Sequence, residues 1–503
     1  MRCKRPASSA LALLLLALAG CSPDAPPRNL VLISIDTLRA DHLGAYGHPW
    51  VKTPAIDALA GESIRFDRVI SAAPTTLASH TSLMTGTYPH RHGVPDNDYR
   101  VAEGNRMLAE VLSEGGFSTS GVVGGYPLGP QTRFHQGFGA YRVLPWDGVN
   151  SEEVSEAALD WLDARGSERF FLFVHYWDVH WPYSPPPPYD RMYRRDSLEM
   201  AGVKSEIDEV RRLLRSRAPD ADARSDVLRR LYAGGVSYVD VQVGILLDGL
   251  RERGLLEDSL VVLTSDHGEM MDEHAAEFWN HGNSVYDAVS RVPLLLRLPG
   301  GAGGGRAEEW RLSNVDLMPT LLELLGLPVP QAIDGESFAG ALLGREAWIG
   351  GQPIYAEATK PHDALHQAGR AWPNAEKCRA IWDDPWKLQH CPVRGRLELH
   401  DLAEDPGEQR NLLGPAGSAS QREAGRRLGR QLATWSQSAD PLETIAERSP
   451  EVIEQLRALG YVDDAAPEPG PRERVERLAP PTQDLDEFAA AGETRLAWVR
   501  SAP

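Results

Sequence analysis

The segment NLVLISI, from Asn29 to Ile35, is an almost uninterrupted run of apolar residues. Two later segments share this character: FFLFVH, from Phe170 to His175, and SLVVLTS, from Ser259 to Ser265. Such runs are typical of parallel strands that are buried on both faces of a sheet. Helical patterns lie between them, at Leu77–Thr85, Asn105–Glu114 and Ser151–Ala164. The alternation predicts an α/β fold with a mostly parallel central sheet flanked by helices.

The chain of 503 residues is long enough for one large domain and a smaller one. Short strand and turn patterns over residues 350–412 predict a small antiparallel subdomain on the C-terminal side. We therefore expect residues 29–345 to form the main α/β domain and residues 346–435 to form a C-terminal α+β subdomain of the same fold. Residues 436–503 are predicted to be a helical tail that contains a Pro-rich linker.

The first twenty residues have a basic start and then a short apolar run, from Ala10 to Ala19, that ends in LAGC. This pattern predicts a signal peptide over residues 1–20. Its end resembles a bacterial lipobox, which implies a lipid on Cys21, a tether over residues 21–28 and contact with the membrane through this anchor. We expect an exported cell-envelope lipoprotein, at the outer membrane or the periplasmic face. The alternatives are an ordinary signal peptide and a short membrane anchor.

The charge of the chain argues against one class of partner. The formal net charge is −19, and loss of the basic leader residues would make the mature chain still more acidic. We expect no binding to nucleic acid, because phosphate backbones are bound by clustered Lys and Arg. One Arg-rich stretch, residues 186–230, is either a lid that attracts an anion or a solvated helical face. The interspersed acidic residues favour the helical face.

Two cysteines remain apart from Cys3 in the leader and Cys21, the expected site of the lipid. Cys378 and Cys391 flank a hairpin pattern whose predicted turn is Asp383-Asp384-Pro385-Trp386. A four-residue loop pairs Trp382 with Lys387 and places the two cysteines opposite each other. An exported protein meets an oxidising compartment, so the pattern predicts a disulfide, with two free thiols as the alternative.

Each of the three strand patterns leads into residues that bind metal ions or phosphate. Asp36 follows the first strand, Asp178 and His180 follow the second, and Asp266 and His267 follow the third. In an open α/β sheet, ligands bind beyond the carboxyl ends of the strands. A single Asp after a strand is usually a helix N-cap. Three such ends, with carboxylate and imidazole ligands, favour a divalent metal site.

Thr76 joins this group from a fourth segment. It lies near the N-terminus of the helix predicted at Leu77–Thr85. The unpaired N–H groups and partial positive charge of a helix N-terminus favour a tetrahedral anion. A metal ion bound to the hydroxyl would lower its pKa and make it a nucleophile. The alternative for this residue is a simple N-cap.

Several segments, in order along the chain, resemble the motifs of sulfatase-like members of the alkaline phosphatase superfamily. They are NLVLISIDTLRADHLGAYG, PTTLASHTSLMTGTYPHRHGV, FLFVHYWDVHWPY, LTSDHGEMMDEH, WNHGNSVYDAVSRVPLL and LELHDLAEDPGEQRNL. The resemblance covers most of residues 29–412. It implies that family's α/β fold and identifies residues 29–345 as a catalytic domain.

The resemblance also implies roles for single residues. The implied metal ligands are Asp36, Asp266 and His267, with Thr76 as the nucleophile and a candidate fourth ligand. His180 and His281 match positions that contact the ester oxygens or the leaving group, and Asn97 matches a substrate-contacting position. The ion is a divalent metal such as Ca, Mn, Mg or Zn. A second ion is an open alternative, with the ligands His80, His180 and His281.

Four positions depart from the family pattern. Thr76 stands where the family has a Cys or Ser that is converted to formylglycine. Oxidation of threonine would give a ketone, because its Cβ carries a methyl group, so this aldehyde cannot form. After the first strand the family has two consecutive Asp residues, and Thr37 stands in place of the second. In the family's signature motif, Ala78 stands in place of a Pro and His80 stands in place of an Arg. Thr76 together with Asp36, Asp266 and His267 resembles the metal set of relatives with a threonine nucleophile. His80 is a further candidate catalytic residue, which could polarise the leaving group.

These observations favour a metal-dependent hydrolase of phosphate or sulfate esters, with Thr76 as the nucleophile. The first alternative is an envelope phosphotransferase that modifies lipid or glycan. The second is a non-catalytic, glycan-binding pseudoenzyme, which the retention of a complete ligand cluster argues against. The expected partner is an anionic ester substrate, such as a glycan or a lipid headgroup.

Overall fold

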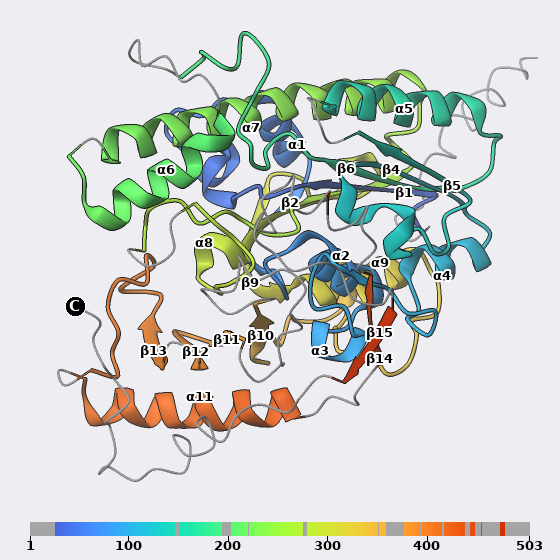
Figure 1. Ribbon diagram of the computed structural model, residues 1–503. Coiled ribbons are helices and arrows are strands. Elements are labelled where there is room, and N and C mark those ends of the chain that lie inside the picture. The colour runs from blue at the N-terminus through green and yellow to red at the C-terminus, as the bar shows by residue number, and fades with distance from the viewer. Residues whose placement is uncertain are drawn as a thin grey trace, which may run out of the picture.

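A central eight-stranded mixed sheet organises the protein (Figure 1). The computed structural model describes residues 26–145, 150–193, 203–219, 221–274, 279–350, 352–358, 377–392, 395–414, 417–437, 443–447, 454 and 473–477. In spatial order, the strands are β5 (Ala140–Leu144), β4 (Ser118–Gly124), β6 (Phe170–Tyr176), β1 (Asn29–Ile35), β7 (Ser259–Thr264), β8 (Arg291–Arg297), β2 (Ile64–Ile70) and β9 (Arg306–Ser313).

The three predicted apolar strands lie side by side at the centre of this sheet. β1 pairs in parallel with β6 on one side and with β7 on the other. Every residue of the three strands is buried, as expected for strands covered on both faces. β8 runs antiparallel to both of its neighbours, and the other pairs are parallel. The predicted, mostly parallel α/β fold is confirmed.

Helices cover both faces of the sheet. Alternate β1 residues point to opposite sides: Val31 and Ile33 pack with α1, α5 and α7, whereas Leu30 and Leu32 pack with α2, α4 and α9. Figure 1 shows these two helical layers above and below the sheet. The helices are α1 (Pro54–Gly61), α2 (Thr76–Thr85), α3 (Pro89–His92), α4 (Leu108–Glu114), α5 (Ser151–Ala164), α6 (Val203–Ser216), α7 (Ala221–Glu252), α8 (Asp287–Ser290), α9 (Leu317–Leu324), α10 (Ala339–Leu342) and α11 (Ala419–Gln437).

A second, four-stranded antiparallel sheet follows α10 and packs against α11 (Figure 1). Its strands are β10 (Ile354–Glu357), β11 (Arg379–Asp383), β12 (Trp386–Cys391) and β13 (Arg396–Asp401). The predicted pairing of Trp382 with Lys387 is present, although Asp383 also pairs with Trp386 and shortens the loop to two residues. Cys378 and Cys391 form a disulfide just beyond the paired residues.

Two described segments of the predicted helical tail are strands, whereas Glu454 is helical. β14 (Glu443–Glu447) and β15 (Glu473–Arg477) pair with each other, and β14 also pairs with β3 (Tyr99–Arg100). β15 lies inside the stretch expected to be a linker. Charged sequences such as ERVER have little strand preference of their own. β15 pairs with β14, and β14 in turn pairs with β3, a segment more than 300 residues away in the chain, which local patterns do not contain.

Other predictions concern the ends of the chain and its Arg-rich stretch. The signal peptide, Cys21 and the last predicted helix all lie outside the described residues. Within those residues, no helix is long and apolar enough to cross a membrane. α6 occupies part of the Arg-rich stretch, and Arg212 and Arg215 on it are exposed, as expected for a solvated helical face.

A buried lysine joins the small sheet to the main domain. The Lys387 ammonium donates to Asp287 Oδ1 at 2.9 Å, lies 2.6 Å from Glu408 Oε1 and sits over the ring of Trp382 at 4.4 Å. Asp287 begins α8 in the main domain, whereas Lys387 is in β12. Burial raises the pKa of Glu408 to about 7. One buried cation therefore contacts two carboxyl groups from different parts of the fold, of which Glu408 is buried and Asp287 is partly exposed.

We expect the Lys387→Met substitution to lower the free energy of unfolding by about 3–5 kcal/mol, because it leaves the buried Glu408 and the partly buried Asp287 without their cation. The measurement is chemical denaturation followed by circular dichroism. Lys52→Met is the matched control, because Lys52 is exposed, and it should change stability by less than about 0.5 kcal/mol. Equal stability of the two variants would contradict the structural role of Lys387.

Candidate active site

The carboxyl ends of β1 and β7 bring three predicted metal ligands together. Asp36 follows β1, and Asp266 and His267 follow β7, its parallel neighbour. One ligand atom from each of the three lies within 4.8 Å of the other two, and all three side chains are buried. The predicted ligands therefore meet at the edge of the sheet where an α/β fold binds its ligands.

The two carboxylates are only partly satisfied by hydrogen bonds. Asp266 Oδ1 accepts from the backbone N–H groups of Thr37 at 3.2 Å and His267 at 2.9 Å. Asp36 Oδ1 and Asp266 Oδ2 have no hydrogen-bond partner among the residues that the structure describes. Burial and the charge of Asp266 raise the pKa of Asp36 well above its usual range. Because a bound cation would offset the burial and the repulsion that raise this pKa, two carboxyl groups buried this close together favour a cation.

Thr76 is the first residue of α2 and is completely buried. Its hydroxyl donates to Asp36 Oδ2 at 3.3 Å. The ten-residue helix ends at Gly86, which takes a left-handed φ of 65°, as the sequence pattern predicts. The hydroxyl thus lies at the positive end of a helix and against a carboxylate of the ligand group.

Hydrogen bonds fix the first turn of α2 in place. Ser79 Oγ donates to the Asp266 carbonyl oxygen at 2.6 Å, which ties the helix to the loop after β7. Leu77 N–H donates to Asn97 Oδ1 at 2.9 Å. Because that amide oxygen is the acceptor, the other amide atom of Asn97 is Nδ2, a buried donor with no hydrogen-bond partner within the described chain. Asn97, a predicted substrate contact, therefore lies beside Thr76 with a donor to offer.

His80 lies one helical turn after Thr76 and is also fully buried. Its Nδ1 is 2.8 Å from the Thr76 carbonyl oxygen, and its Nε2 is 2.8 Å from Ser34 Oγ. Burial lowers the pKa of His80 to about 3, so the imidazole is neutral at pH 7. Both nitrogens are engaged, and His80 positions the first turn of α2 rather than facing the leaving-group histidines.

His175, at the end of β6, is a site residue that the sequence reasoning treated only as part of a strand. Its Nε2 lies 3.3 Å from Asp36 Oδ2, and its ring centroid is 5.0 Å from that of His80. Burial lowers its pKa to about 4. His80, His175 and Asp266 form a second group whose ligand atoms lie within 4.8 Å of one another. The sequence could have indicated His175 as a site residue, because it is a histidine at the carboxyl end of an apolar strand.

The two predicted leaving-group residues meet on the other side of the ligand group. The rings of His180 and His281 are 5.1 Å apart, and His281 is 4.5 Å from His267. His281 Nδ1 lies 3.2 Å from Glu269 Oε1, and Tyr183 O–H donates to Glu269 Oε2 at 2.8 Å. His80 instead groups with His175, so the second metal set proposed from sequence has the wrong partners. The reason is that His80 projects from α2 toward β1 and β6.

Two further positions around the site are informative. Asp178 is not part of either ligand group. It accepts from the backbone N–H groups of Asn150 and Ser151, the latter at 2.7 Å, and so caps the N-terminus of α5.

Thr37 has φ 53°, a left-handed conformation that is unusual for a β-branched residue. Its buried hydroxyl has no hydrogen-bond partner in the described part of the chain. Such backbone strain is often kept at functional sites.

Comparison with protein families places these residues inside known sequence models. The Sulfatase family model matches residues 28–327. A second model, N-sulphoglucosamine sulphohydrolase, C-terminal, matches residues 276–437. The first match contains both ligand groups, Thr76 and Asn97, and the second contains His281, the small sheet and α11.

Comparison with single proteins also finds sulfatases and related hydrolases. An ulvan-active sulfatase from Formosa agariphila is 28% identical over 439 residues, covering 80% of this chain and 81% of that protein. The phosphonate monoester hydrolase of Agrobacterium radiobacter has a similar fold, with a TM-score of 0.64 and 24% identity over 81% of this chain and 95% of that one. A structure solved with its substrate D-glucosamine-2-N,6-O-disulfate gives a TM-score of 0.67, with 20% identity over 82% and 98% of the two chains.

We expect Asn97→Ala to lower the free energy of unfolding by about 1–3 kcal/mol, because the buried N–H of Leu77 loses its acceptor. The measurement is chemical denaturation of the purified protein. Asn97→Ser, whose hydroxyl can accept a hydrogen bond, should recover part of the loss. An Asn97→Ala variant as stable as the wild type would show that α2 does not depend on this contact.

Proposed function

Because the chain belongs to the sulfatase family, we propose that it is a metal-dependent hydrolase of phosphate or sulfate esters with the Thr76 hydroxyl as its nucleophile. The chain is a sulfatase-like ester hydrolase, since its relatives include sulfatases and a phosphonate monoester hydrolase. The observation that supports the finer proposal is the position of Thr76. Its buried hydroxyl lies at the N-terminus of α2 and contacts Asp36 at 3.3 Å.

The residues around Thr76 fit a divalent metal ion. Asp36 Oδ1, Asp266 Oδ2 and His267 Nε2 are buried atoms without a hydrogen-bond partner among the described residues. His267 Nδ1 is 2.9 Å from the Gly268 carbonyl oxygen, so Nδ1 carries the proton and Nε2 is the free lone pair. Carboxylates and one imidazole suit Mg, Mn, Ca or Zn. When bound, such an ion would increase the acidity of the nearby hydroxyl and stabilise charge on the ester oxygens.

We assign the residues of the site to the two sides of the ester bond that is cleaved. On one side, the Thr76 hydroxyl passes its proton to Asp36 Oδ2, which it contacts at 3.3 Å, and Thr76 Oγ attacks the phosphorus or sulfur. The bond from Oγ to that atom forms as the bond to the leaving oxygen breaks. His180 and His281 are on the other side, where the leaving oxygen takes up a proton. Water then attacks the Thr76 ester, which releases the inorganic anion and restores the hydroxyl. The α2 N-terminus and Asn97 Nδ2 offer donors to the equatorial oxygens.

Threonine makes phosphate esters the favoured substrates. A formylglycine hydrate releases sulfate through its second hydroxyl, whereas a threonine ester must be cleaved by direct attack of water. We further propose an anionic glycan ester as substrate, since one structural neighbour was solved with a sulfated glucosamine as its substrate. An acceptor alcohol in place of water would make the same site a phosphotransferase.

The nucleophile is tested by comparing wild type, Thr76→Ala and Thr76→Ser. The substrates are an aryl sulfate, a phosphate monoester, a phosphodiester and a phosphonate monoester. We expect Thr76→Ala to lower kcat/KM on the best substrate by about 10³-fold or more, because no nucleophile remains. Thr76→Ser keeps the hydroxyl and should retain activity. Unchanged turnover by Thr76→Ala would contradict the mechanism.

The metal requirement is tested with Asp36→Asn. The variant loses one carboxylate of the proposed ligand group, so we expect bound divalent metal and activity to fall together. Metal content is measured by mass spectrometry after dialysis against a trace of the ion. Asp178→Asn is the matched control, because Asp178 also follows a sheet strand but binds only backbone N–H groups. Full activity of metal-free protein would exclude the proposal.

A further inference from the structure

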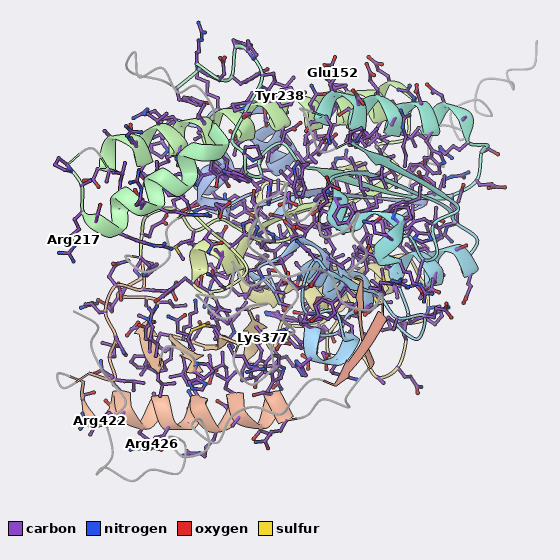
Figure 2. The ribbon with its side chains drawn as sticks, in the orientation of Figure 1. Glu152, Arg217, Tyr238, Lys377, Arg422 and Arg426 are labelled. Atoms are coloured by element: carbon purple, nitrogen blue, oxygen red, sulfur yellow. A yellow bond between two sulfur atoms is a disulfide. The ribbon has the colours of Figure 1, made fainter. Side chains whose placement is uncertain are left out.

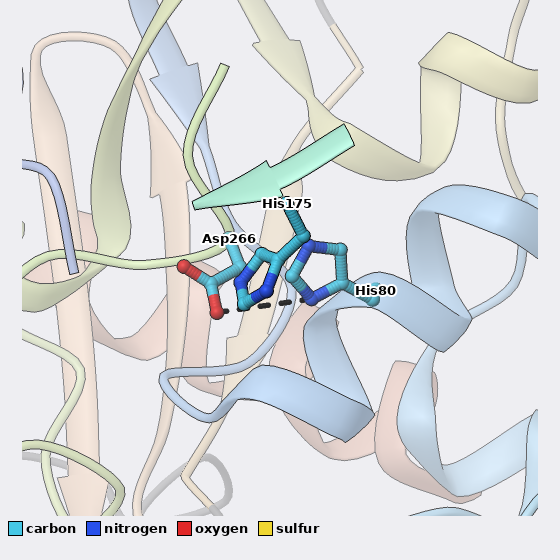
Figure 3. A group of neighbouring side chains, drawn as sticks. All are labelled: His80, His175 and Asp266. Atoms are coloured by element: carbon cyan, nitrogen blue, oxygen red, sulfur yellow. Dashed lines mark ion pairs between the residues drawn. The ribbon is translucent and has the colours of Figure 1, made fainter. Parts of the chain in front are cut away.

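In the proposed function His281 assists the leaving oxygen, so the contacts that fix this side chain matter for the rate. The His281 ring lies 5.1 Å from that of His180. On the other side of the ligand group, His80 and His175 group with each other (Figure 3). His281 is held instead by contacts of its own segment of chain, which includes Trp279.

Trp279 has a backbone conformation that residues other than glycine rarely adopt. Its φ is 52°, in the left-handed region, and its large side chain is only 1% exposed. Backbone hydrogen bonds hold this conformation. Trp279 N–H donates to the Met271 carbonyl oxygen at 2.7 Å, and Asn280 and Met270 exchange two bonds of 3.0 Å each. The loop after β7 is therefore paired with the two residues directly before His281.

The indole of Trp279 is anchored to α7 by a chain of hydrogen bonds. Its Nε1–H donates to Ser225 Oγ at 2.9 Å, and the Ser225 hydroxyl donates to Asp272 Oδ2 at 2.6 Å. Arg229 forms an ion pair with the other carboxylate oxygen of Asp272. Ser225 is completely buried. The N-terminal part of α7 therefore holds the indole, and Asp272 connects it back to the loop after β7.

These contacts connect the Arg-rich stretch, residues 186–230, to the site. In α6, Arg211 donates from Nε to the Trp279 carbonyl oxygen at 3.0 Å. Arg217, directly after α6, is exposed and points away from the protein (Figure 2). The stretch is thus a solvated helical face in which Arg211 and Arg229 turn inward toward Trp279 and its hydrogen-bond chain.

A second series of contacts reaches the imidazole itself. The Trp279 ring packs against that of Tyr183 with 5.6 Å between centroids, and the Tyr183 hydroxyl donates to Glu269 Oε2 at 2.8 Å. Glu269 Oε1 lies 3.2 Å from His281 Nδ1. Tyr183 and Glu269 are both buried, so water does not compete for these contacts. Trp279 therefore acts on His281 in two ways, along the chain and through Tyr183 and Glu269.

We propose that Trp279 is a positioning residue, which holds His281 at the leaving oxygen of the ester. The inference deepens the proposed function and rests on the role assigned there to His281. Backbone strain such as that of Trp279 persists only where the surrounding contacts over-determine it. Gly would take the same φ without strain, but it would lack the contacts of the indole with Ser225 and Tyr183. A displacement of about 1 Å near the reacting atoms can lower a rate about 10²-fold.

The experiment compares Trp279→Phe with wild type on two esters of the acid, phosphoric or sulfuric, whose esters the wild type hydrolyses. One ester releases nitrophenol and the other releases phenol. The phenol oxygen is the poorer leaving group and depends more on His281. Phe keeps an aromatic ring but cannot donate to Ser225. We expect kcat/KM to fall about tenfold or more on the phenyl ester and less than about twofold on the nitrophenyl ester. A purely structural role would lower both values equally.

His281→Ala is the reference variant, because it removes the imidazole and should show the same selective loss to a larger extent. Trp382→Phe is the matched control. Trp382 is also buried and donates its Nε1–H to Asp287 Oδ1 at 3.0 Å, but it belongs to the small sheet. This variant should keep the wild-type ratio of the two kcat/KM values. Thermal unfolding shows whether each variant folds. If Trp279→Phe does not, Ser225→Ala decides by the same ratio, because it removes the acceptor and leaves the indole.

Two outcomes separate this inference from the function on which it rests. A selective loss in His281→Ala, with none in Trp279→Phe, would overturn the positioning role of Trp279 alone. An equal loss on both esters in His281→Ala would contradict the role of His281 itself, and the positioning role with it.

Discussion

The contact between two buried carboxylates, Asp36 and Asp266, is the constraint on which the site depends. Burial of one unpaired charge is costly, and burial of two like charges side by side costs more. The fold imposes their proximity, because β1 and β7 are parallel neighbours and end at the same edge of the sheet. Several features of the site offer partial positive charge or a donor to this pair. The N-terminus of α2, the Thr76 hydroxyl and the backbone N–H groups of Thr37 and His267 all point toward it.

The sequence predicted those parts of the structure that local patterns determine. Asn29–Ile35 could only be a strand covered on both faces, because nearly all of its side chains are apolar, and β1 has those bounds. α2 ends at Gly86, where only a residue that tolerates a left-handed φ continues the chain easily. The pairing of Trp382 with Lys387 follows from the position of the turn, and it brings Cys378 to Cys391. At the site, Asp36, Asp266 and His267 were found because each directly follows a strand.

The sequence could not predict features that depend on which elements become neighbours. His175 belongs to an apolar strand, and only the pairing of β6 with β1 brings it to Asp36. Asp178 follows β6 by two residues and Asp36 follows β1 by one, yet α5 begins beside Asp178 and takes its carboxylate. β14 becomes a strand because β3 offers it an edge. In each case a distant contact decides between roles that the local sequence leaves equally open.

The departures at Thr37 and His80 are best understood together. In the family pattern these positions carry an Asp and an Arg, one negative and one positive charge. Here both are uncharged, since Thr37 has no ionisable group and burial lowers the pKa of His80 to about 3. The formal charge of the site is therefore unchanged by the pair of substitutions, while the number of charges buried within it falls by two. Each buried ion carries a desolvation penalty of several kcal/mol, so losing both is easier than losing either alone. The arrangement keeps Asp36 and Asp266 as the main ionisable groups and leaves neutral side chains, a hydroxyl and an imidazole, where the family pattern has two charged residues.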